Sequence, residues 1–214
     1  MSPDGSGPAL LYSPRVRWPV VLLVFLAAVL LAQLGFQVHS AVNAQRLFAK
    51  YARPGELPTL LSVFWIGFTL LTPLASLLAK RLGGIVSMTL GALVAAGSSW
   101  AAAQATNVAS LGIAQFICGA AWGAVMVSAV VAAFAIGRNG GEGTAVGAVF
   151  SVIAVATMAR IALVTAHGDQ VPAIATALPW LPTVAWLAAA LVLIGVPTLR
   201  RAADTSAPGR DGRG

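Results

Sequence analysis

The chain has 214 residues, of which 58% are hydrophobic and only 9% are charged. Soluble domains carry about 25% charged residues, so this composition excludes a soluble globule and indicates an all-α, polytopic membrane protein. The net charge of +7 does not indicate nucleic acid as a partner, because the cations lie at the ends of apolar runs, where a membrane topology places them.

The first apolar run, residues 18–38, follows a Pro- and Gly-rich stretch, 1–14, that we expect to be a flexible cytoplasmic tail. The run is longer than the apolar core of a signal peptide, which has about 7–15 residues, so we interpret it as a transmembrane helix. Residues 39–56 predict an amphipathic extension of this helix near the membrane interface, ended by Pro54-Gly55.

A charge-free run at 57–79 is followed by Lys80-Arg81 and then by Gly83-Gly84. An α-helix of about 20 apolar residues crosses the ~30 Å hydrocarbon layer. The two cations place the end of the run at the lipid headgroups, and the glycines allow the chain to reverse. This stretch therefore predicts a helix, a tight basic turn and another helix.

No charged residue occurs between Leu82 and Gly137, a length that fits two membrane helices separated by the polar residues 104–107. A Gly-rich loop at 137–143 follows, and prolines delay the last helix, with 172–178 as a short helical lead-in. The transmembrane bundle, 15–201, thus holds six predicted spans, followed by a flexible cytoplasmic tail at 202–214. The spans are 18–38, 57–79, 84–103, 109–135, 144–166 and 180–199.

Six spans place both termini on the same side of the membrane. Nine cations then lie on that side and three, Arg46, Lys50 and Arg53, lie on the other. Because positive residues are retained in the cytoplasm, we expect cytoplasmic termini and a location in a bacterial inner (plasma) membrane.

Polar side chains inside the spans are candidates for function, because lipid offers them no hydrogen bonds. Arg160 extends to the outer headgroups, faces an anionic substrate group, or has a structural partner within or between helices. Gln33, Gln37 and Ser40 share one helical face. Gln115, Cys118, Trp122 and Met126 form another stripe; both stripes fit either helix packing or a cavity lining. The candidate substrate contacts are Gln37, Gln115, Trp122 and Arg160.

Small residues recur at four-residue spacing, which permits close helix approach in lipid. We expect Gly119 with Gly123, and Gly143 with Gly147, to lie at helix contacts. A further small-residue stripe consists of Gly91, Ala95 and Ser99.

We expect neither enzymatic activity nor a cofactor. The spans carry no carboxylate, which argues against a proton relay and against a pair of acidic catalytic groups. The sequence also has no nucleotide-binding glycine loop. The single cysteine, Cys118, excludes an intrachain disulfide, and His39 and His167 are too far apart in sequence to propose a metal site.

The turn after the second span resembles the Gly-x-Leu-Ala-Asp-Arg-x-Gly-Arg-Arg signature of the major facilitator superfamily. The match covers Leu78, Ala79, Arg81 and Gly83, and Lys80 replaces the acid. Residues 115–121 resemble the family's Arg-Phe-Leu-x-Gly-x-Gly element with Gln115 in the arginine position. Residues 143–147 are similar to the Gly-x-Ala-x-Gly start of its fifth helix.

The resemblance implies one half of such a transporter, a six-helix bundle of two inverted three-helix repeats, with Lys80, Arg81 and Gly83 in its gating turn. One half needs a second half to move against. The first hypothesis is therefore a half-size transporter of a small solute, acting as a homodimer or with another membrane subunit. The second is a non-transporting accessory or structural subunit of a larger membrane complex.

Overall fold

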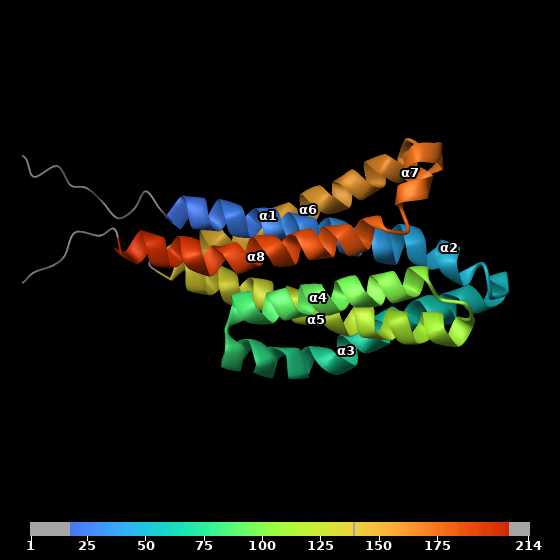
Figure 1. Cartoon of the computed structure of the whole chain (residues 1–214), viewed down its shortest axis with the longest axis horizontal. Coiled ribbons are helices and arrows are strands. Elements are labelled where there is room, and N and C mark those ends of the chain that lie inside the picture. Colours follow the sequence, from blue (N-terminus) through green and yellow to red (C-terminus); the bar gives the residue numbers. More distant parts are fainter. Residues whose placement is uncertain (1–17, 139, 206–214) are drawn as a thin grey trace, which may run out of the picture.

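The computed structural model describes residues 18–138 and 140–205, and this part of the chain consists of helices joined by short turns, without a β-strand (Figure 1). The α-helices are α1 (Trp18–Phe36), α2 (Ala44–Phe48), α3 (Leu57–Leu82), α4 (Gly84–Ala103), α5 (Val108–Gly137), α6 (Glu142–Thr165), α7 (Pro172–Ala177) and α8 (Leu181–Thr205). A π-helical segment, Gln37–Asn43, joins α1 to α2, and 3-10 turns form Pro54–Glu56 and Gly168–Gln170.

Five stretches are long and apolar enough to cross a membrane: Pro19–Phe48, Pro54–Leu82, Gly84–Ala103, Val108–Gly137 and Glu142–Thr165. The prediction of an all-α membrane protein is therefore confirmed. The sixth predicted span, 180–199, coincides with α8, whose described apolar stretch, Leu181–Pro197, is shorter than the other five.

The predicted bounds of the four middle spans lie within three residues of the ends of α3, α4, α5 and α6. The predicted lead-in at 172–178 is the short helix α7. Of the predicted tails, 1–14 lies outside the described residues. The segment 202–205 is not part of a tail but the last turn of α8, and the rest of that tail is outside the described residues.

The first helix differs from its prediction. It continues from Trp18 through the π segment, Gln37–Asn43, to Phe48, so the expected break at Pro54-Gly55 comes after its end. The extension has one buried and one exposed face: Phe48 is fully buried in a cluster with Ala102, Leu111 and Ala114, whereas Arg46 and Lys50 are exposed. Its buried face packs on the ends of α4 and α5.

Helices α1 and α5 organise the packing of the bundle. Helix α5 packs along α3 and α4, helix α1 packs along α8 and α6, and α4 and α8 pack against each other (Figure 1). The main core combines alanines of α4 and α5 with a few large side chains. Phe25 of α1, Met88 of α4, and Trp186 and Leu193 of α8 are fully buried in it.

Glycines allow the backbones of α3 and α5 to touch. A Cβ atom on Gly67 would overlap the carbonyl oxygen of Phe116, and one on Gly119 would overlap that of Phe64. Gly123 faces Thr72 in the same crossing. In a membrane the hydrophobic effect does not drive helices together, because lipid is as apolar as their side chains. Close contact between small residues stabilises the pair through van der Waals packing instead.

Gly143 and Gly147 do not lie at a contact within this chain. A Cβ atom on either would have nothing within 4 Å, and both residues are exposed on α6. The expectation that they pack helices is wrong for a single copy, because α6 turns its other face, with Ala145 and Val149, toward the bundle.

We expect Gly67→Ala to destabilise the bundle by about 1–3 kcal/mol, because the added methyl group forces α3 away from the Phe116 carbonyl. Thermal unfolding in a mild detergent measures the change. Gly97→Ala is the matched control, since Gly97 is exposed on α4 with nothing within 4 Å of its Cβ position. Equal melting temperatures for the two variants would contradict the close crossing.

Candidate functional site

The π segment, Gln37–Asn43, is the irregular part of the first membrane helix. In a π-helix each N–H bonds five residues back, so the turn is wider than in an α-helix; such turns are rare and often found at functional sites. Gln37, His39 and Asn43 are all buried in it, at 7%, 2% and 4% exposure. The segment therefore directs three polar side chains into the protein within seven residues.

Each of these side chains bonds a different part of the bundle. Gln37 donates from Nε2 to the Thr157 hydroxyl of α6 over 2.8 Å. Asn43 donates from Nδ2 to the Leu178 carbonyl, between α7 and α8, over 2.6 Å. His39 has its Nε2 3.0 Å from Oε1 of Gln115 on α5. The π segment thus ties α5, α6 and the start of α8 to the first helix.

A second set of contacts continues from His39 into α4. The thiol of Cys118, one turn after Gln115 on α5, is within interaction range of the imidazole. Its Sγ lies 3.7 Å from the hydroxyl of Ser99. All these groups are buried. They form a continuous polar path through the bundle, from the π segment across α5 to α4.

The candidate substrate contacts meet different partners. Gln37 and Gln115 belong to the polar path, but Trp122 does not. Its ring stacks on Phe36, with centroids 4.2 Å apart, and meets Trp186 edge-on. Trp122 is 5% exposed, so it is a core residue that holds α5 to α1 and α8.

Arg160 lies one turn after Thr157 on α6. It is half-buried, and its Nε is buried without a hydrogen-bond partner. Other buried side-chain atoms among the described residues also lack partners, including Oε1 of Gln33, Nε2 of Gln115 and Oγ1 of Thr183. Unsatisfied polar groups are costly away from water, so each is a place where a further polar contact would fit.

The Gln33 stripe is only partly as expected. Gln33 and Gln37 are buried together, as a shared inward face requires. Ser40 is half-buried and bonds the Phe36 carbonyl of its own helix. The wider turn of the π segment brings His39 inward in its place.

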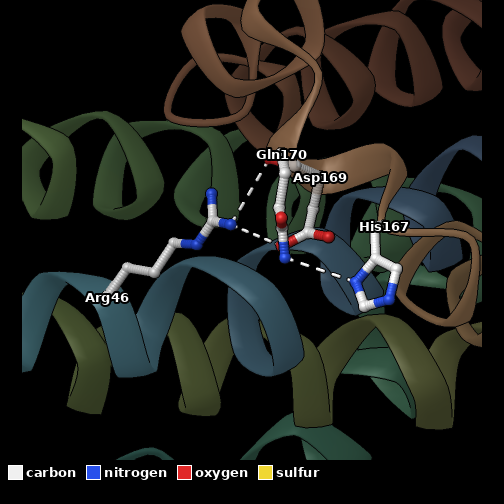
Figure 2. Close-up of polar contacts among 4 residues, drawn as sticks. All are labelled: Arg46, His167, Asp169 and Gln170. Atoms are coloured by element: carbon white, nitrogen blue, oxygen red, sulfur yellow. Dashed lines mark hydrogen bonds and ion pairs between the residues drawn. The ribbon is translucent and has the colours of Figure 1, made fainter.

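Near its end, the first helix is held to the loop after α6 (Figure 2). Arg46 of α2 contacts Asp169 through an ion pair of 2.5 Å, and Gln170 Nε2 lies 3.3 Å from His167 Nδ1. His167 has φ 53°, the left-handed turn geometry that ends α6. The exposed Arg46 makes this contact a weak addition to the buried bonds.

At the other end of the bundle, the predicted basic turn is present. Lys80 and Arg81 are exposed in the last turn of α3, where cations complement the helix dipole. Gly83 has φ 84°, which allows the reversal, and α4 begins at the next residue. A Cβ on Gly84 would lie 2.5 Å from the backbone nitrogen of Ala132, so the turn also seats α4 on α5.

A shallow hollow lies at the start of α3, next to the start of α5. It is lined by Gly55, Glu56, Thr59, Leu60 and Val108. None of the predicted substrate contacts lines it. Within the described residues, no group of three or more metal-binding side chains comes together.

Sequence reasoning missed His39, Asn43 and Thr157. On a regular helix His39 is about 200° from Gln37, so the two would not be expected in one buried network at 3.6 residues per turn. The sequence does contain one indication of this network: amide and imidazole side chains recur within a single apolar run. The π segment that places them depends on neighbouring helices.

No family model, curated protein or solved structure matches this chain.

We expect Asn43→Leu to cost about 1–3 kcal/mol of stability, because it leaves the buried Leu178 carbonyl without its donor. Arg46→Gln, three residues further along, should cost less than about 1 kcal/mol, since its ion pair is exposed. Melting temperatures in detergent at low and high salt test the pair. The Arg46 loss should vanish at high salt and the Asn43 loss should persist; the reverse order would contradict this ranking.

Proposed function

We propose that this protein is a half-size membrane transporter of a small solute, similar to one half of a major facilitator superfamily protein. It would act as a homodimer or with another membrane subunit. The observation that carries the proposal is a symmetric packing pattern: in each of two groups of three helices, the first helix packs against the second and third helices of the other group.

The first group consists of the first helix, α3 and α4; the second consists of α5, α6 and α8. Helix α1 packs against the second and third helices of the other group, α6 and α8. Helix α5 likewise packs against α3 and α4, and the two third helices pack against each other. Two inverted repeats around a twofold axis produce this pattern, so it supports a half-transporter with α8 as the sixth span.

The exposed surfaces of α3 and α6, the second helix of each group, support the proposal of a partner. Only 17% of the apolar window of α3 and 11% of that of α6 is buried within the chain, against 56% for α5. Helix α6 also exposes Gly143, Gly147 and Ser151, at four-residue spacing. Large apolar residues stand beside them, such as Phe150. A face with both small and large residues suits helix packing as well as lipid.

The polar side chains support a solute path in one half of the membrane. Gln33, Gln37, Gln115 and Arg160 all lie in the half nearer the α6–α7 loop. Arg160 is partly exposed and is the cation available to an anionic group of a solute. A second half facing it would complete the cavity that one chain does not form.

The charge distribution supports the orientation. In the proposed topology, Lys80, Arg81 and Arg138 share an end of the bundle with the start of α1. Arg46, Lys50 and Arg53 lie at the opposite end. In the sequence, Arg15 and Arg17 precede the first helix, and Arg200 and Arg201 lie at the end of the last. With these four cations counted, the positive-inside bias supports cytoplasmic termini, and we propose a bacterial inner membrane.

The packing of Trp122 and the hydrogen bonds of Gln37 and Gln115 favour a second candidate, an accessory subunit of a larger membrane complex. In such a protein these side chains hold the fold together and the outer faces of α3 and α6 bind other subunits. Lys80 in place of the family's acid fits this role as well.

Native mass spectrometry in mild detergent separates the two candidates. We expect the wild-type chain to be a dimer, and Gly147→Ile to weaken it at least about tenfold by blocking the α6 face. Gly97→Ile, on the exposed side of α4, is the control and should remain a dimer. Isolation of the native protein in a stable complex with unrelated subunits would support the accessory role.

A thermal-shift screen with organic anions tests Arg160. We expect an anion that the protein binds to raise the melting temperature of the wild type and of Arg160→Lys, but not of Arg160→Leu, which lacks the charge. Matched neutral solutes serve as the control. Equal shifts for Arg160→Leu and the wild type would confine Arg160 to contacts with lipid headgroups.

A further inference from the structure

His39 and Cys118 are the fully buried titratable side chains in the described part of the bundle. The other buried polar residues are glutamine, asparagine and serine, which carry no charge at any physiological pH. Histidine is the side chain whose charge ordinarily changes between about pH 5 and 8. A buried imidazole within a network of uncharged partners is therefore the group in this network that a proton can act on.

We propose that His39 is a proton-binding site and that its protonation alters the hold of the π segment, Gln37–Asn43, on α5. The binding of a proton at His39 does not depend on the proposed transport. A role of that proton as the coupling ion does rest on the proposed function.

The geometry at His39 assigns the direction of its bonds. Nε2 faces the carbonyl oxygen of the Gln115 amide at 3.0 Å, so this nitrogen carries hydrogen and donates. The neutral ring then has Nδ1 free to accept. Protonation transfers one proton from a hydronium ion to Nδ1: an N–H bond forms, an O–H bond of the hydronium breaks, and water is left. The ring becomes a donor on both sides.

The change of one nitrogen from acceptor to donor must reorganise its surroundings. The Cys118 thiol is the polar group in range besides Gln115, and it can turn its S–H toward Ser99, 3.7 Å away. Nε2 of Gln115 is buried without a partner, so the amide is held by His39 on one side alone. The contact between the π segment and α5 therefore has more than one arrangement, and the proton selects between them.

The charged groups around His39 make its protonated form consequential. Helix α6 presents Arg160 to the same half of the bundle, and α2 presents Arg46, which is neutralised by Asp169. From α3, the Phe64 ring faces the imidazole with centroids 6.3 Å apart, near the range of a cation–π contact. The described elements packed against the π segment supply no buried carboxylate. A cation at His39 is thus not offset by a buried carboxylate, and its charge acts on the contact between the π segment and α5.

His39 lies nine residues before the end of the first helix at Phe48, roughly 13 Å by helix rise. It is 2% exposed, so proton exchange with water requires local opening of the bundle. Glu56 and Glu142 lie near the starts of their spans, and no carboxylate among the described residues is buried. His39 is therefore the buried group in this part of the bundle that can take up a proton.

NMR of the full chain with isotope-labelled histidine tests the proposal. The chain has two histidines, and His167 is exposed in a loop and serves as the internal reference. We expect the imidazole signal that His39→Gln removes to shift between about pH 5 and 8 in the wild-type protein. A His39 signal that stays constant over this range would overturn the proposal.

Hydrogen exchange tests the coupling to the π segment. We expect amides 37–43 to exchange about threefold or more faster below the His39 midpoint than above it, after correction for intrinsic rates. His167→Gln should keep this difference, and His39→Gln should remove it. Titration of His39 without a change in these amides would overturn the coupling. Because neither readout depends on dimerisation or solute, a failure here differs from a failure of the proposed transport.

Discussion

A polar side chain inside a membrane helix needs a partner within the protein, and this requirement shapes the centre of the bundle. The π segment, Gln37–Asn43, satisfies it by turning Gln37, His39 and Asn43 toward three different elements. Removal of one of these bonds would leave a donor or acceptor in a region without water. The helices α5, α6 and α8 are thus held at fixed positions around the first helix by polar bonds.

Close backbone packing provides the other half of the cohesion. Glycines 67 and 119 bring α3 onto α5, and Gly84 seats α4 beside it. These glycine contacts stabilise the bundle through van der Waals packing. The apolar outer faces contribute little to its stability, because lipid solvates them equally well. Packing is consequently tight along α5, whereas most of the apolar surface of α3 and α6 is exposed.

The candidate site illustrates what pattern reasoning can reach. The spacing of Gln33 and Gln37 predicts an inward polar face, and both side chains are buried. The same reasoning grouped Gln115 with Trp122 as one stripe, although Gln115 bonds His39 and Trp122 stacks on Phe36. A helical stripe shows which residues share a face, but the neighbouring helix decides whether each meets a polar or an apolar group.

The sequence by itself determined the class of protein and the approximate ends of α3, α4, α5 and α6, because apolar length, cations and glycine breaks act locally on a helix in a membrane. Only the tertiary structure decided the π segment, the contact of His39 with Gln115 and the outward position of Gly143 and Gly147. These depend on contacts between residues as far apart as 39 and 115. Helical periodicity carries no information about which helices are neighbours.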